Sequence, residues 1–206
     1  MSAHPAPGKP CSERALAQRE RILAAAKQCF VEHGFHAAGM ALIAQTAGMS
    51  PGLIYRYFDS KNAIILAIVE RQLEVSRAGI CALRDAKDFA QGVFEVFNRW
   101  LSADPDIMNA ALFLEMSAEA GRDPQLRQAL ADSDREVRKE FVRWLSRSVE
   151  EGGLSLAPDV AEVRALGLQC FVEGLAVRAL REPDVSPQAL KAAIANFLAG
   201  MLASGD

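Results

Sequence analysis

Residues 38–58 read AGMALIAQTAGMSPGLIYRYF, a stretch that predicts two short helices. Apolar spacing predicts the first near Met40–Ala47, and Gly48 marks its end because the left-handed position after a helix favours glycine. Ser50-Pro51 marks the start of the second, which continues through Tyr57. A serine oxygen accepts a free backbone N–H there, and proline fits the first helical position. Two short helices joined by a glycine-containing turn form a helix-turn-helix pattern.

The second helix is expected to pack with one side and to expose the other. Ala44 and Ala47 are small where the two helices must approach each other. On the exposed side, Tyr55 and Arg56 suit double-stranded DNA, because arginine offers a fork to guanine edges or phosphates and tyrosine can bond a phosphate. The predicted DNA-contacting residues are Gly39, Ser50, Pro51, Gly52, Tyr55, Arg56, Tyr57 and Lys61.

Several of these residues also have simpler interpretations. Arg56 is alternatively a solvated surface charge, and Tyr57 is alternatively a packing residue. Arg14, Arg19 and Arg21, near the start of the first helix, either add phosphate contacts or remain solvated.

The distribution of charge supports a DNA contact better than the net charge of −3 does. Residues 1–61 hold seven Lys and Arg against four Asp and Glu, which leaves +3 there and −6 over the rest. A basic end on an acidic chain suits a protein that docks one end on a polyanion. An excess of three charges also arises by chance, so it supports the helix-turn-helix and does not replace it.

The remaining sequence also has helical apolar spacing, without the alternation of a β-strand. Predicted helix starts pair a capping residue with proline, at Ser50-Pro51, Asp104-Pro105, Asp123-Pro124 and Ser186-Pro187. Predicted helix ends are Gly34, Gly48, Gly121 and Gly152. The 206 residues therefore predict an all-α fold of about nine helices. The expected parts are a flexible arm (1–12), a three-helix helix-turn-helix domain (13–60) and a helical ligand-sensing and dimerisation domain (61–206).

No apolar run approaches the ~20 residues of a membrane span. The first ten residues lack the apolar core of a secretory signal, so a cytoplasmic location is expected. The four cysteines form no CxxC pair and the three histidines complete no zinc pattern, so neither a metal site, a disulfide nor a cofactor is expected.

A longer pattern surrounds the two short helices. Its pieces are Ile22-Leu23-Ala24-Ala25-Ala26, Phe30, Gly34-Phe35, Ile43-Ala44, Ala47-Gly48-Met49-Ser50, Gly52-Leu53-Ile54-Tyr55, Tyr57-Phe58 and Ser60-Lys61. Over residues 19–66 the chain thereby resembles the DNA-binding domain of the TetR (tetracycline-repressor) family. The resemblance implies an all-helical, dimeric regulator that a small molecule releases from DNA. Where the family commonly has Ser or Thr before the second helix and Arg early in it, this chain has Ala38, Gly39 and Ala41.

The C-terminal part predicts a ligand pocket and a dimer interface. Ligand sites in helical proteins are mostly apolar with a few polar groups. The predicted ligand-binding residues are Phe94, Phe97, Trp100, Met108, Phe113, Met116, Trp144 and Glu115, and Glu173 is a second carboxylate that could orient a polar or cationic ligand. The predicted dimer interface comprises Gly167, Cys170, Phe171, Gly174, Leu190, Ile194, Phe197 and Met201 on the last two helices. For both sets the alternative is packing within one chain.

These patterns favour a transcriptional repressor that binds a palindromic operator as a homodimer and responds to a small effector. An activator of the same family is the alternative, because the sign of regulation depends on operator position. A helical adaptor and an enzyme are the remaining alternatives. The sequence contains no P-loop, no Ser/His/Asp arrangement and no HExxH motif, so no enzymatic activity is expected.

Overall fold

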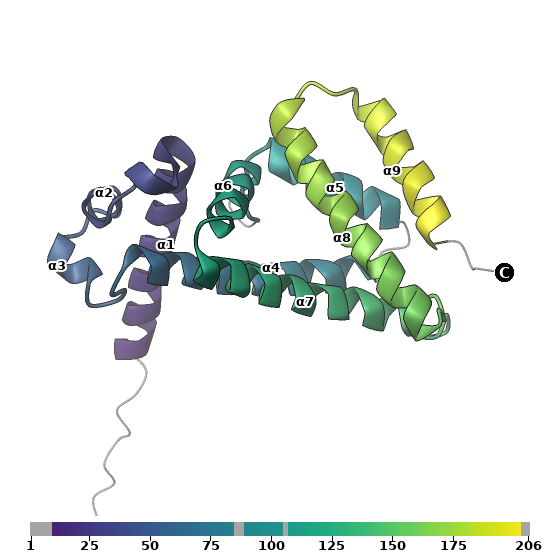
Figure 1. Ribbon diagram of the computed structural model, residues 1–206, viewed down its shortest axis with the longest axis horizontal. Coiled ribbons are helices and arrows are strands. Elements are labelled where there is room, and N and C mark those ends of the chain that lie inside the picture. The colour runs from purple at the N-terminus through teal and green to yellow at the C-terminus, as the bar shows by residue number, and fades with distance from the viewer. Residues whose placement is uncertain (1–9, 85–88, 105–106, 203–206) are drawn as a thin grey trace, which may run out of the picture. The chain divides into compact units, whose positions relative to one another are not determined.

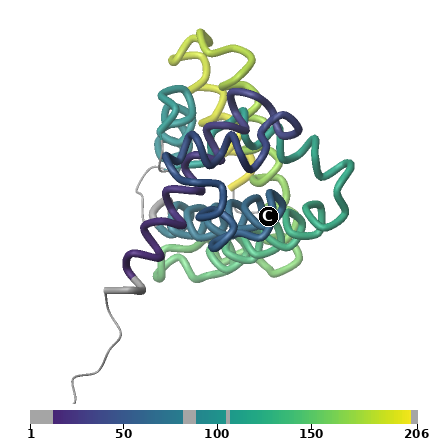
Figure 2. Tube along the Cα trace, turned by 90° about the vertical axis from the view of Figure 1, so that its left-hand side faces the viewer, coloured from purple at the N-terminus to yellow at the C-terminus, as the bar shows by residue number. Residues whose placement is uncertain are grey.

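The computed structural model describes residues 10–84, 89–104 and 107–202, which contain nine α-helices and no strand (Figure 1). The helices are α1 (Pro10–Ala37), α2 (Met40–Thr46), α3 (Pro51–Ile54), α4 (Lys61–Arg84), α5 (Phe89–Leu101), α6 (Ala110–Ala120), α7 (Pro124–Ser146), α8 (Pro158–Arg181) and α9 (Pro187–Leu202). Figure 2 shows the Cα trace of the same helices from a second side. The all-α prediction is confirmed. Residues 1–9 of the predicted arm, and Pro105 of one predicted helix start, lie outside the described residues.

The chain separates into two compact units, and the division falls inside α4, between Ile68 and Val69. The N-terminal unit contains α1, α2, α3 and the first turns of α4, where Ile64, Ile65 and Ile68 are buried. The division expected from the sequence, between Ser60 and Lys61, lies at the start of α4, before these buried side chains.

Side-chain caps start several helices where the sequence indicated. The Ser50 hydroxyl accepts from the Leu53 N–H at 3.3 Å, and the Asp123 carboxylate accepts from the Gln125 N–H at 2.8 Å. The Ser186 hydroxyl accepts from the Ala189 N–H at 3.3 Å. The start of α6 was missed, because its cap, Asn109, has no proline after it.

The predicted helix ends are only partly correct. Gly48 (φ 62°) follows α2 in the left-handed conformation, as expected. Gly34 (φ 74°) kinks α1, which continues to Ala37. Gly152 (φ 80°) lies in the connection after α7, which is capped at Arg147. Helix α6 ends at Gly121 as predicted, but the glycine is not left-handed there, because its φ of −64° is ordinary right-handed backbone.

The core of the C-terminal unit is built from α5, α7, α8 and α9. Phe97, Leu145, Leu168 and Ile194 are each at most 1% exposed and belong to one apolar cluster. Helix α9 packs on α5 and α8, and α6 packs on α7 and α8. Helices α8 and α9 form a hairpin (Figure 1). Within the described residues, no helix is both long and apolar enough to cross a membrane.

Replacing Gly48 with alanine is expected to destabilise the protein by about 1–2 kcal/mol, because an L-residue is strained at φ 62°. The new Cβ would also lie 2.6 Å from an Nη atom of Arg21, which must move. Urea unfolding measures the change. Gly52→Ala is the control, because a Cβ there meets nothing within 4 Å. Equal stabilities of the two variants would contradict this account of the turn.

Candidate nucleic-acid interface and ligand cavity

Arg19 of α1 holds the end of the helix-turn-helix in place. Its Nη1 donates to the backbone carbonyl of Tyr57 at 3.0 Å, and its guanidinium carbon lies 4.3 Å from the centre of the Phe58 ring. Phe58 is buried, so the cation also covers part of the core of the N-terminal unit. Arg19 was considered as a phosphate contact, and the structure gives it this intramolecular role.

Lys61 makes a matching contact at the other end of α1. Its Nζ donates to the Phe35 carbonyl at 2.6 Å and lies 4.9 Å from the centre of the Phe35 ring. The ammonium therefore stabilises the end of α1, where carbonyls lack helical partners. Lys61 therefore has a structural role within the unit, and its contact with a phosphate stays a prediction.

Most of the predicted DNA-contacting residues between Ser50 and Arg56 are exposed to solvent. Tyr55 is 52% exposed, and Ser50, Pro51, Gly52 and Arg56 are also exposed. Ile54 lies in the same segment and anchors it to the core of the unit, because its side chain is fully buried. Tyr57 is half-buried, so it combines packing with partial access to solvent.

Helix α3 is shorter than predicted, because regular helix stops at Ile54. The chain then tightens, with the Arg56 N–H on the Leu53 carbonyl and the Tyr57 N–H on the Ile54 carbonyl. These bonds span three residues, which is a 3₁₀ pattern. Tyr55 and Arg56 therefore lie on a hydrogen-bonded turn beyond the α-helix.

The start of α2 lacks a polar side chain, as the sequence indicated. Gly39 caps α2 with no side-chain hydrogen bond, and Gly39 and Ala41 are exposed. Arg21 supplies a charge nearby, because its guanidinium lies against Gly48 in the turn between α2 and α3. The exposed cations of this unit therefore include Arg21 and Arg56.

The C-terminal unit contains a cavity of about 260 Å³ among α4, α5, α6, α7 and α8. Four predicted ligand-binding residues line it: Trp100, Met108, Phe113 and Met116. The other four do not. Phe97 and Trp144 are buried in the core, Trp144 stacks on Phe89, and its Nε1 donates to the Gly152 carbonyl at 3.0 Å. Phe94 packs against the same core, and Glu115 is outside the lining.

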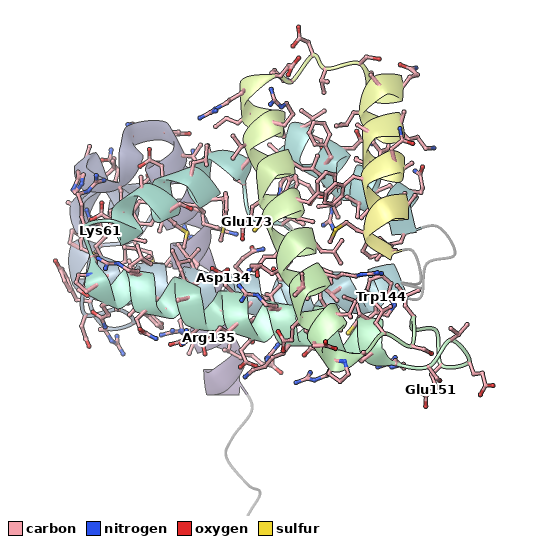
Figure 3. All side chains as sticks on the ribbon, turned by 45° about the vertical axis from the view of Figure 1, so that its right-hand side comes forward. Lys61, Asp134, Arg135, Trp144, Glu151 and Glu173 are labelled. Carbon is pink, nitrogen blue, oxygen red and sulfur yellow. The ribbon has the colours of Figure 1, made fainter. Side chains whose placement is uncertain are left out.

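Two carboxylates line the cavity from facing helices, Asp134 on α7 and Glu173 on α8 (Figure 3). Desolvation raises the pKa of Glu173, and the negative charge of Asp134 raises it further. Desolvation also raises the pKa of Asp134, against the lowering effect of the Arg138 charge. Glu173 was identified from its apolar surroundings. Asp134 was missed, although it falls at helical spacing between Leu130 and Val137, which also line the cavity.

The predicted dimer residues divide into an exposed and an inward group. Cys170, Gly174 and Phe197 are exposed, and Phe171 stacks on Phe197 with ring centres 4.0 Å apart. Leu190 and Ile194 are 7% and 0% exposed in the core of their own chain, which fits packing within one chain, the alternative that the sequence left open.

Gly167 and Met201 also face each other within one chain. A Cβ at Gly167 would lie 2.6 Å from the Met201 methyl group, so the glycine lets α9 approach α8. The outer side of α8 carries large apolar residues that the prediction did not include, among them Val163 (73% exposed) and Leu166 (45%).

Both parts of the chain are similar in sequence to known protein families. The model for bacterial regulatory proteins of the tetR family matches residues 22–68, and the model for the C-terminal part of BetI-type transcriptional repressors matches residues 92–203. The HTH-type transcriptional regulator UidR of Escherichia coli is 32% identical over 146 residues, 69% of this chain and 70% of that protein. The HTH-type transcriptional activator FasR of Mycolicibacterium smegmatis is 40% identical over 75 residues, 36% of this chain and 34% of its own.

The solved structure of Salmonella enterica GusR has the same fold, with a TM-score of 0.74 and 27% identity over 95% of this chain and 98% of that one. The chain belongs to the TetR family of bacterial transcriptional regulators. It is therefore a ligand-responsive DNA-binding regulator with a helix-turn-helix. Regulators of this family usually act as dimers and are generally not enzymes.

Glu173→Gln is expected to raise the thermal unfolding midpoint at pH 7.5. Folding raises the pKa of the Glu173 carboxyl above its ordinary value, which is near 4.5. The folded protein therefore loses stability as the pH rises from 4.5 through the raised pKa. The groups that act on Glu173 are Asp134, which repels it, and Arg138, which attracts it.

The gain in stability should disappear below pH 4.5, where the wild-type carboxyl is protonated in both states. Glu162→Gln, on the exposed side of the same helix, is the control and should show no gain. A variant at Glu173 that melts below the wild type at pH 7.5 would refute this electrostatic reasoning.

Proposed function

We propose that this regulator is a repressor that holds a palindromic operator as a homodimer and releases it when a small effector enters the cavity of the C-terminal unit. The observation that carries the DNA contact is the exposed turn with Tyr55 and Arg56, fixed on α1 through Arg19. Rigid presentation matters because a flexible loop would lose ordering entropy on every binding event. Such a protein works in the cytoplasm and catalyses no reaction.

The sign of regulation is proposed from the C-terminal part. The BetI-type repressor model covers residues 92–203, which supply the cavity lining apart from Val69, Gln72 and Ser76 of α4. The activator FasR is similar to 36% of the chain, which is too short a match to cover that part. A repressor is therefore the better-supported assignment, with activation as the second candidate.

Release by an effector is proposed to act through α4. Val69, Gln72 and Ser76 of α4 line the cavity, and the same helix begins with Lys61 in the N-terminal unit. We propose two conformations that differ in the position of α4, and an effector that binds one of them more tightly increases its population. A coupling of ~1–3 kcal/mol between the effector and DNA changes DNA affinity by ~5–150-fold.

Arg56→Ala is expected to reduce affinity for the preferred duplex by about 10- to 100-fold, because one well-placed arginine contributes about that much to base discrimination. The duplex is first identified by selection from random DNA, and affinities are then measured by fluorescence anisotropy at several salt concentrations. Arg135→Ala is the control, because Arg135 is an exposed arginine of the C-terminal unit. If both variants bind the duplex like the wild type, Arg56 and the turn after α3 do not recognise the DNA sequence.

Val163→Asp is expected to convert a dimer into a monomer, because it places a charge on the exposed apolar side of α8. Sedimentation velocity measures the change. Val149→Asp is the matched control, since Val149 is 69% exposed in the connection after α7. A Val163 variant that remains dimeric would place the interface elsewhere.

A further inference from the structure

A second, apolar compartment of about 160 Å³ lies beside the cavity of the C-terminal unit. The two spaces share part of their walls, namely Gln72, Ser76, Trp100, Val137, Phe141 and Val172. Because the same six side chains line both, the two spaces are adjacent, and one elongated molecule with a group in each space would pass between these side chains. The two ends of this combined space differ in chemistry.

One end is acidic. Among the residues that line the 260 Å³ space, Asp134 and Glu173 carry charge and no Lys, Arg or His is present. Glu173 makes no hydrogen bond or ion pair with another described residue. The nearby Arg138 donates from Nε to Gln169 at 3.1 Å, and Gln169 in turn bonds Asp134. Glu173 is therefore left with acceptor capacity that faces a space large enough for a ligand.

The walls next to these carboxylates are aromatic. Trp100, Phe113 and Phe141 line the same space as Glu173. Aromatic faces attract cations through the ring quadrupole, and carboxylates attract them by charge, so the two kinds of group select the same ligand. An anionic effector would instead meet two like charges with no cation in the lining to offset them.

The other end is apolar. Ile80, Val93, Val96 and Leu175 contribute to the 160 Å³ compartment and are not shared with the acidic space. The one cation in this lining, Arg99, is paired with Asp104 at 2.7 Å. This compartment suits a hydrocarbon chain or ring.

We propose that the effector is an amphiphilic organic cation, with an ammonium-type head at Glu173 and Asp134 and an apolar body that extends past Trp100 toward Val96. This assignment deepens the proposed function, since it names the chemical class of the molecule that the regulator senses. The cost of holding two desolvated carboxylates near each other in the empty protein is offset when the cation binds.

The test uses butyl- and octyltrimethylammonium, with octyl sulfate and octanol as charge controls, on the full-length protein without DNA. Trp100 reports binding through its fluorescence, and calorimetry confirms the affinities. Octyltrimethylammonium should bind about 10- to 100-fold more tightly than the butyl compound, because each added buried methylene strengthens binding. Octyl sulfate should bind at least 10-fold more weakly than the octyl cation. Equal binding of sulfate and ammonium, or no binding of either cation, would overturn the proposal.

Two variants assign the ends of the space. Glu173→Gln should weaken both cations about 10-fold or more and leave octanol unchanged, whereas the control Glu162→Gln should change none of them. Val96→Phe should remove the advantage of the octyl over the butyl chain and leave butyl binding intact, because it fills the apolar compartment only. Circular dichroism melts establish that each variant folds. Wild-type cation binding by folded Glu173→Gln would refute the head site.

DNA affinity is measured separately on the same preparations. If the duplex binds and the cations do not, the effector assignment fails and the regulator assignment stands. If the cations bind and no duplex is ever preferred, the proposed function fails and the ligand site stands.

Discussion

The contact of Arg19 with the Tyr57 carbonyl and the Phe58 ring is the constraint on which the DNA-facing surface depends. Helix α3 has only four residues, too few to be stable by itself. Its position comes from buried Ile54 below, the Ser50 cap before it and the Arg19 contact after it. With both ends held by hydrogen bonds, Tyr55 and Arg56 remain exposed on a turn that has less conformational freedom to lose when DNA binds than an unbonded loop has.

The N-terminal unit uses part of its basic residues for its own structure. Arg19 and Lys61 are bound to carbonyls and rings within the unit, which leaves Arg21 and Arg56 among the cations that face solvent. The C-terminal unit has a different feature, because Glu173 makes no hydrogen bond or ion pair with another described residue and desolvation raises its pKa. Two cations of the N-terminal unit hold its own structure in place, and one carboxylate of the C-terminal unit lines a cavity that a ligand can enter.

The sequence predicted best where local chemistry decides the structure. Ser50 and Gly48 determine the ends of α3 and α2 through a hydroxyl cap and a left-handed backbone, and both were read directly. Prediction failed where tertiary contacts decide. Leu190 packs into the core, and Lys61 donates a hydrogen bond to the Phe35 carbonyl. Both contacts depend on neighbours that are distant in the sequence. Asp134 was overlooked because it lies among polar residues, and only its helical register connects it to the cavity.

The central claim is that the turn presented by α3 is the surface that meets DNA. Hydrogen–deuterium exchange of the full chain, with and without its preferred duplex, measures this most directly. The account predicts that backbone amides of residues 52–57 exchange more slowly when the duplex is bound, while those of α9 are unchanged. Protection that appears elsewhere and leaves residues 52–57 unaffected would contradict it.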